Sequence, residues 1–242
     1  CECIAVRAAP KALDDLPAPL LVAPHGGPHM TSTTVFSTDV AYFCIAGFEV
    51  LLINYGGSAG YGEEFLTSLS GQAGSADVLD VVSTAAAYAA LGPARPLCLF
   101  GGSHGGFIVA HACAAAPGMF VAGAMFNAVL NLHANAAGSD IPEWTEAVAG
   151  EDLDSASPIA CVERMNVPLL IAAALKDARV PSCQSIQYYR ALCVRGIDTC
   201  LLLFPNDTHS LTIPRHWGEL LVCTSQWLRK FTSRFCKSDL HE

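Results

Sequence analysis

The chain has 242 residues, 52% of them hydrophobic and 14% charged, so it can fold around one large core and lacks the composition of a disordered protein. Thirteen Lys and Arg against 22 Asp and Glu give a net charge of -9, which repels a phosphate backbone and argues against nucleic acid as a partner. No apolar run approaches the roughly 20 residues that cross a bilayer, so no membrane span is expected.

Six short apolar runs predict strands, and four longer stretches predict helices. The strands are expected at 20–23, 48–53, 97–100, 121–126, 168–174 and 199–204, and the helices at 77–91, 106–116, 182–195 and 217–235. Nearly continuous apolar strands that alternate with helices predict right-handed βαβ units. The expected fold class is therefore α/β, with a mostly parallel central sheet and helices on both faces. Sites in such sheets gather at the carboxyl ends of the strands.

The domain organisation is expected to be simple. The first residue is Cys1 rather than Met, which indicates a piece of a longer protein. Residues 1–19 are expected to lead in from an upstream region, and residues 20–242 to form one catalytic domain. Within it, residues 128–160 are irregular and predict a loop-rich cap beside the site.

The eleven cysteines predict free thiols rather than a metal centre. Most stand alone in apolar runs, none has the C-x-x-C spacing of a metal site, and only Cys1 and Cys3 are near neighbours. Unpaired thiols are typical of a reducing compartment. We therefore expect a cytoplasmic protein with no metal and no other cofactor.

A nucleophile is predicted directly after the strand at 97–100. The sequence Gly-Gly-Ser-His-Gly-Gly at 101–106 fits the G-x-S-x-G elbow, and it lies between a strand and a helix as that motif requires. A Cβ at Gly101 or Gly105 would clash in so tight a turn. Ser103 is therefore the expected nucleophile of an α/β-hydrolase fold, close to the positive end of the next helix.

A serine hydroxyl needs a histidine to take its proton and a carboxylate to orient that histidine. In this fold the chain order is Ser, then Asp or Glu, then His, on loops after late strands. Asp177 follows the strand at 168–174, and His209 follows the strand at 199–204. Asp207 and His216 are the rival acid and base. Asp207 shares the loop of His209 and is expected to be a solvated turn residue, while His216 does not follow a strand.

The remaining motif before the nucleophile is His-Gly-Gly-Pro at 25–28, directly after the strand at 20–23. In this fold such a loop supplies one oxyanion donor and the residue after the nucleophile supplies the other. The backbone N–H groups of Gly27 and His104 are the candidates. The side chains of His25, His104 and His111 are expected to brace or pack rather than to react.

Seven segments together resemble the prolyl oligopeptidase family, in that family's order and over residues 20–230. They are HGGPH at 25–29, NYGGSAGYGEEF at 54–65, GGSHGGF at 101–107, SDIPEW at 139–144, SPI at 157–159, DARVP at 177–181 and NDTHSL at 206–211. The nearest likeness is to the branch that removes N-acylated amino acids from short peptides.

The resemblance implies a serine peptidase whose partner is a short N-acylated peptide. It implies Ser103, Asp177 and His209 as the catalytic residues, Gly27 and His104 as oxyanion donors, and Arg179 as a substrate-binding residue. It also implies an upstream β-propeller, and it leaves a homo-oligomer open.

Some alternatives stay open at this point. Arg179 could instead be a surface arginine in an ion pair. The family carries an arginine at the position of Gly56, so the loop beside the oxyanion site is expected to be looser here. A dipeptidyl peptidase, an oligopeptidase or a carboxylesterase would use the same machinery. A silent binding domain is the alternative from another class, although it would have no need of all three predicted catalytic residues.

Overall fold

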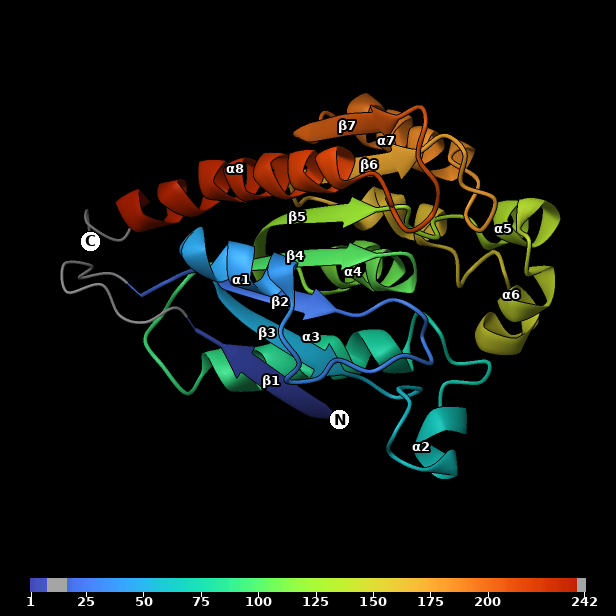
Figure 1. Ribbon diagram of the computed structural model, residues 1–242, viewed down its shortest axis with the longest axis horizontal. Helices are drawn as coiled ribbons and strands as arrows, with labels where there is room; N and C mark the ends of the chain where they lie inside the picture. Colours follow the sequence, from blue (N-terminus) through green and yellow to red (C-terminus); the bar gives the residue numbers. More distant parts are fainter. Residues whose placement is uncertain (8–16, 239–242) are drawn as a thin grey trace.

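A seven-stranded sheet organises the computed structural model, which describes residues 1–7 and 17–238 (Figure 1). The strand order is β1-β3-β2-β4-β5-β6-β7, and each neighbouring pair is parallel except β1 with β3. The strands are β1 (Glu2–Val6), β2 (Leu20–Pro24), β3 (Glu49–Asn54), β4 (Leu97–Gly102), β5 (Phe120–Phe126), β6 (Leu169–Ala174) and β7 (Thr199–Phe204). The expected mostly parallel α/β sheet is thus confirmed.

The order of the strands reverses between β2 and β4. After β3 the chain crosses back over β2 and continues on its other side, so the loops after β2 and β4 leave the sheet next to each other in opposite directions. Such a switch point leaves a crevice at the carboxyl ends of the strands, where ligands bind in open α/β sheets. The His-Gly-Gly-Pro loop and Ser103 both lie at this crevice.

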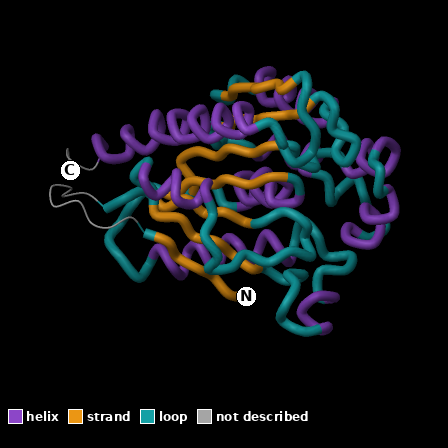
Figure 2. Tube along the Cα trace, viewed as in Figure 1, coloured by secondary structure: helices purple, strands orange, loops and turns teal. Residues whose placement is uncertain are grey.

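Helices cover both faces of the sheet (Figure 2). On one face α1 and α8 pack side by side, and on the other α3, α4 and α7 contribute to a larger core. The helical elements are α1 (Thr38–Ile45), α2 (Glu63–Thr67), α3 (Ala76–Ala89), α4 (His104–Ala115), α5 (Leu132–Gly138), α6 (Pro142–Ala149), the 3-10 helix η1 (Pro158–Arg164), α7 (Cys183–Val194) and α8 (Pro214–Ser238).

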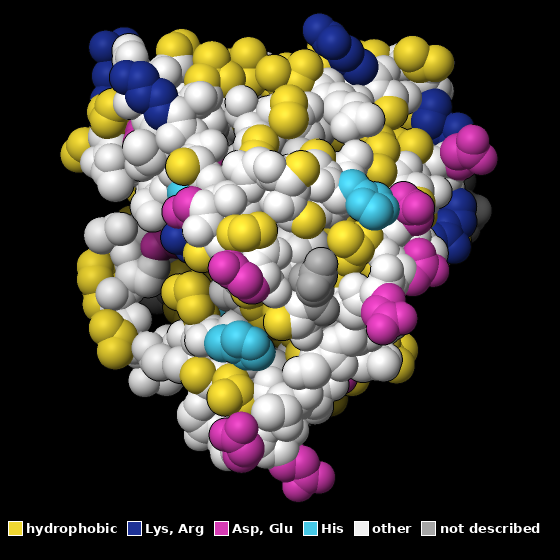
Figure 3. Space-filling view, turned by 90° about the vertical axis from the view of Figure 1, so that its right-hand side faces the viewer, with side chains coloured by type: hydrophobic (Ala, Val, Ile, Leu, Met, Phe, Trp, Pro, Cys, Tyr) yellow, Lys and Arg dark blue, Asp and Glu magenta, His cyan; other side chains and the backbone are white. Residues whose placement is uncertain are grey.

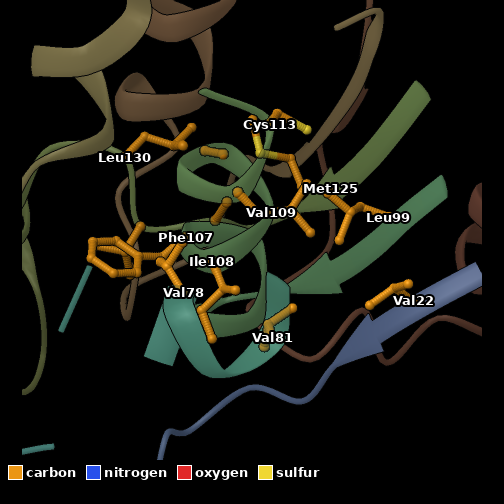
Figure 4. Packing of buried hydrophobic residues seen from close by; sticks show 14 of the residues in the cluster. Val22, Val78, Val81, Leu99, Phe107, Ile108, Val109, Cys113, Met125 and Leu130 are labelled. Carbon is orange, nitrogen blue, oxygen red and sulfur yellow. The ribbon is translucent and has the colours of Figure 1, made fainter. Parts of the chain in front are cut away.

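The helix that follows the nucleophile is buried on all sides. Ile108 and Val109 of α4 pack among side chains of α3 and of the strands β2, β4 and β5 (Figure 4). Eleven of the twelve residues of α4 are buried, which fits a helix that is apolar or small around its whole circumference. Burial on every side fixes α4, and with it the turn that carries Ser103.

Several elements differ from the sequence predictions. The structure adds β1, α1 and α2, and α8 begins at Pro214, three residues before the predicted start. Pro is favourable in the first turn of a helix, because it has no N–H to leave unpaired. The segment 128–160 is not simply irregular: it contains α5, α6 and the start of η1. The Asn131 side chain caps α5 by accepting from the Ala134 N–H at 3.0 Å.

The first strand, Glu2–Val6, joins the edge of the sheet. β1 pairs antiparallel with β3, from Glu2 opposite Asn54 to Val6 opposite Val50. All five of its residues are exposed or half-buried, as fits a strand at the edge of the sheet. Among the helices that the structure describes, none is long and apolar enough to cross a membrane.

Candidate active site

Ser103 occupies a strained turn between β4 and α4. Its φ is 55° and its ψ is -123°, a backbone conformation that costs a residue with a Cβ of order 1–3 kcal/mol. The backbone packs so closely around this turn that two positions require glycine. A Cβ on Gly101 would lie 2.5 Å from the Gly105 carbonyl, and one on Gly105 would lie 2.4 Å from the Pro24 oxygen. The expected need for glycine at both positions is confirmed, and Ser103 is held out at the edge of the sheet.

A chain of two hydrogen bonds links Ser103, His209 and Asp177. The His209 Nε2 lies 3.0 Å from the Ser103 Oγ, and the His209 Nδ1 lies 2.7 Å from the Asp177 Oδ2. The other oxygen of Asp177 accepts the backbone N–H groups of Arg179 at 2.8 Å and Val180 at 2.9 Å, so this carboxylate is fixed in orientation. With Nδ1–H donated to Asp177, Nε2 is free to accept a proton from Ser103, which is the arrangement that activates a serine.

Asn127 ties the three segments together, a role that no sequence motif predicts. Its Nδ2 donates to the His209 carbonyl at 2.7 Å, and its Oδ1 accepts the Ala174 N–H at 2.8 Å. The carbonyl of Phe126, the residue before Asn127, accepts the Ser103 N–H at 3.0 Å. Asn127 is buried and has a φ of 45°, which asparagine tolerates better than most residues. It therefore holds the loop of His209 against the strand that leads to Asp177.

The oxyanion candidates are two unengaged backbone amides beside Ser103. Among the described residues, neither the Gly27 N–H nor the His104 N–H has a hydrogen-bond partner. The loop of Gly27 lies against the elbow, since a Cβ on Gly26 would be 3.2 Å from the Gly102 oxygen. Two free amides, one of them at the start of α4, suit an oxygen that develops negative charge.

His25 braces that loop, as expected. Its Nε2 lies 2.8 Å from the Ser58 Oγ, and its ring stacks on Tyr55 at a centroid distance of 4.5 Å. The Tyr55 hydroxyl donates to the His25 carbonyl at 2.8 Å. Burial lowers the pKa of His25 to about 4, so the ring is neutral near pH 7.

The side chain of His104 points away from the chemistry. Its Nε2 lies 2.8 Å from the Asp77 Oδ2, its ring stacks on Phe107, and both polar side chains are fully buried. His111 is similarly packed, with its Nε2 3.0 Å from the backbone oxygen of Ala156. The expectation that these side chains pack rather than react agrees with this placement.

The rival acid and base pair with each other. The His216 Nδ1 lies 3.0 Å from the Asp207 Oδ2, and neither residue hydrogen-bonds Ser103 or His209. The expectation that Asp207 is a solvated turn residue is wrong, because it is only 1% exposed. Its carboxylate accepts backbone N–H groups at 208, 212 and 213, directly before α8. Asp207 therefore organises the turn that presents His209.

Arg179 reaches the site but is already paired. Its Nε and its Nη2 both bond Asp140, the latter at 3.2 Å, and this pairing lowers the pKa of Asp140. The expected alternative of an ion pair is thus present, and Arg179 also lines a cavity at Ser103. At Gly56, the backbone N–H donates to the Asp80 Oδ2 at 2.8 Å, so this part of the loop is tethered rather than free.

Two cavities meet at Ser103 and His209. The smaller, of about 190 Å³, is lined among others by Gly27, Trp144 and Arg179. The larger, of about 590 Å³, extends under the segment 30–40 toward β4, β5 and the start of α8. Figure 3 looks onto the face where the parallel strands end and shows it hollowed on its left side, with hydrophobic side chains around the hollow. Two spaces thus adjoin the Ser103 hydroxyl, one reaching Trp144 and Arg179 and the other reaching Phe126 and Trp217.

Comparisons with known proteins place this geometry among peptidases. The model of the prolyl oligopeptidase family matches residues 34–233. The acylamino-acid-releasing enzyme of Arabidopsis thaliana is 39% identical over 230 residues, which are 88% of this chain and 30% of that protein. The enzyme of the same name from Homo sapiens is 36% identical over 233 residues, 89% of this chain and 32% of that protein. The chain thus spans about a third of the length of these relatives.

Solved structures show the same fold. A puromycin hydrolase has a TM-score of 0.88 at 27% identity, covering 95% of this chain and 37% of that chain. An acylaminoacyl peptidase in complex with Z-Gly-Gly-Phe-chloromethyl ketone has a TM-score of 0.88 at 23% identity, covering 95% of this chain and 39% of that chain. The second likeness, at this identity, supports the fold alone.

Proposed function

Because the chain belongs to the prolyl oligopeptidase family, whose model matches residues 34–233, we propose that it is the peptidase domain of a serine hydrolase that releases N-acylated amino acids from short peptides. The observation that carries the proposal is the chain of hydrogen bonds from Ser103 through His209 to Asp177. The curated relatives named acylamino-acid-releasing enzymes support the substrate class.

The proposed reaction has two steps. The Ser103 Oγ attacks the carbonyl carbon of the acylated residue while its proton moves to the His209 Nε2, and Asp177 stabilises the imidazolium. When the C–N bond breaks, His209 gives this proton to the leaving amine, and an ester on Ser103 remains. Water then attacks the ester with His209 again as base, which frees the N-acyl amino acid and restores Ser103.

The negative charge of each tetrahedral intermediate falls on the former carbonyl oxygen. The Gly27 and His104 amides are proposed to bind it, and losing one such donor typically costs about 2.7–4 kcal/mol of barrier lowering. The dipole of α4, which begins at His104, acts in the same direction.

Selectivity for an acylated amino end is proposed to come from the smaller cavity. Arg179 lines it and uses two of its three nitrogens for Asp140, which leaves Nη1 for a substrate carbonyl. An acylated amino end offers such a carbonyl and carries no charge. A free amino end would bring a cation toward a guanidinium, which is unfavourable in a partly enclosed site.

The test compares matched substrates. The full chain should hydrolyse acetyl-alanyl peptides and ignore the same peptides with a free amino end, and Ser103→Ala should abolish the activity. Preference for the free amino end, or equal activity of Ser103→Ala, would contradict the proposal.

The proposal extends to the setting of the domain. The short span relative to the curated relatives is compatible with an upstream β-propeller, and the relatives' length leaves room for one. The ten cysteines whose side chains the structure describes all have free thiols, which supports a reducing, cytoplasmic location. Self-association is an open part of the proposal, to be measured by light scattering on the purified chain.

A further inference from the structure

We propose that the larger cavity beside Ser103 is the subsite for an apolar side chain of the leaving peptide, on the residue that directly follows the acylated one. This inference rests on the proposed function and names the preference of the same site on its other side. The cavity, of about 590 Å³, is large enough for a side chain of leucine or phenylalanine size.

The assignment follows from the two cavities and the two groups that a substrate must place. The carbon attacked by Ser103 carries the acylated residue on one side and the leaving nitrogen on the other. Both cavities share Ser103 and His209, but Gly27 lines only the smaller one. Because the Gly27 amide and Arg179 both lie at the smaller cavity, the acylated residue belongs there. The leaving peptide is then directed into the larger cavity.

The walls of the larger cavity define the chemistry of its occupant. Most of its side chains are apolar, including Met30, Val35, Phe36, Val40, Phe126 and Trp217. Val35 and Phe36 are 78% and 79% exposed. An apolar ligand in the cavity would remove these two side chains from water, which is favourable. Two such neighbouring residues beside a nucleophile are better explained by a binding role than by chance exposure.

Charge works in the same direction. Among the residues that line the larger cavity, Asp39 is the one with a carboxylate, and Arg and Lys are absent from this described lining. The Asp39 carboxylate accepts the Ser37 hydroxyl at the start of α1. An acidic residue on the leaving peptide would therefore meet an apolar wall and a like charge.

The experiment measures kcat/KM of the full chain for acetyl-alanyl-X-amides, in which X is Leu, Ala or Asp. Leu should exceed Ala by roughly 10-fold or more, the size of discrimination that an apolar pocket gives for a few added methylenes. Asp should be slower than Ala. Acetyl-alanine methyl ester, whose leaving group is too small to fill the cavity, reports the proposed function separately.

A double variant, Val35→Ala with Phe36→Ala, tests the cavity itself. Both side chains are mostly exposed, so the change should not disturb the core. It should reduce the Leu-to-Ala ratio of kcat/KM to below about 3-fold, because the apolar surface that contacts the leucine side chain is lost. The matched control is Leu91→Ala, an 81% exposed leucine outside both cavities, which should keep the wild-type ratio.

The outcomes separate the two proposals. Equal rates for Leu, Ala and Asp, or an unchanged ratio in the double variant, overturn the subsite, while hydrolysis of the acetyl-alanyl amides themselves still supports the proposed function. Failure to hydrolyse either the ester or any amide overturns the proposed function as well. A preference for Asp over Leu would show that the cavity binds a group of opposite chemistry.

Discussion

Replacing Asn127 is the sharpest test of how the site is held together. In Asn127→Ala two hydrogen bonds are lost, the one to the His209 carbonyl at 2.7 Å and the one from the Ala174 N–H at 2.8 Å. Each is worth about 1 kcal/mol in net terms, and alanine at a φ of 45° adds about 1 kcal/mol. The free energy of unfolding should fall by about 3 kcal/mol.

The effect on chemistry should be larger than on folding. In the variant, His209 is no longer held within hydrogen-bonding distance of the Ser103 Oγ. A misplacement of about 1 Å typically costs about 100-fold in rate. We expect kcat to fall by about that factor while KM changes little, because Asn127 is buried and lies outside both cavities. Urea unfolding and steady-state kinetics on an acetyl-alanyl substrate measure the two effects.

Two further substitutions divide the causes. Asn127→Gly accepts the left-handed backbone without strain but lacks both hydrogen bonds, so it should be less destabilised than Asn127→Ala and just as slow. Asn127→Asp keeps an acceptor for Ala174 but loses the donor to His209, so it should lose rate as well. A glycine variant with wild-type kcat would refute the reasoning, because it would show that the side chain does not position the base.

Three other predictions follow from the same geometry. Gly105→Ala places a Cβ 2.4 Å from the Pro24 oxygen, so it should displace the loop of Gly27 and abolish turnover. Steady-state kinetics and a thermal melting curve measure the two effects, and full activity would mean that the loop does not pack against Gly105 in this way. His25 has a pKa of about 4 when folded against 6.5 when free, so the unfolded chain binds more protons between these values and stability is lost as pH falls from 6.5 to 4, by at most about 3 kcal/mol. His25→Gln, followed by urea unfolding at several pH values, should flatten that dependence, and an unchanged slope would assign it elsewhere. His216→Gln should retain kcat within about 3-fold, whereas His209→Gln should lose at least about 1,000-fold; the reverse order would make His216 the base.

The fold was largely predictable because its central strands, β2 to β6, are almost entirely buried. Such strands read as unbroken apolar runs, and all six predicted ones exist, with bounds within about one or two residues. The edge strand β1 was missed, since it is short and none of its residues is fully buried. α5 and α6 were missed as well, because seven- and eight-residue helices leave too few turns for a period to show.

The site was predictable where it depends on chain order and not where it depends on backbone conformation. Ser103, Asp177 and His209 follow three strands that end at the same edge, and the structure brings them into hydrogen-bonding distance. Nothing in the sequence around Asn127 signals a left-handed residue that bonds two other loops. The burial of Asp207 was misjudged for a related reason, because its partners are backbone groups of the turn before α8.

The central claim is that Ser103 forms a covalent acyl-enzyme. A fluorophosphonate probe, followed by digestion and mass spectrometry, tests it directly, because the probe reacts with a serine hydroxyl that a histidine activates. The adduct should lie on Ser103, and labelling should be absent in Ser103→Ala and strongly reduced in His209→Gln. An unlabelled wild-type chain, or equal labelling of Ser103→Ala, would contradict the account.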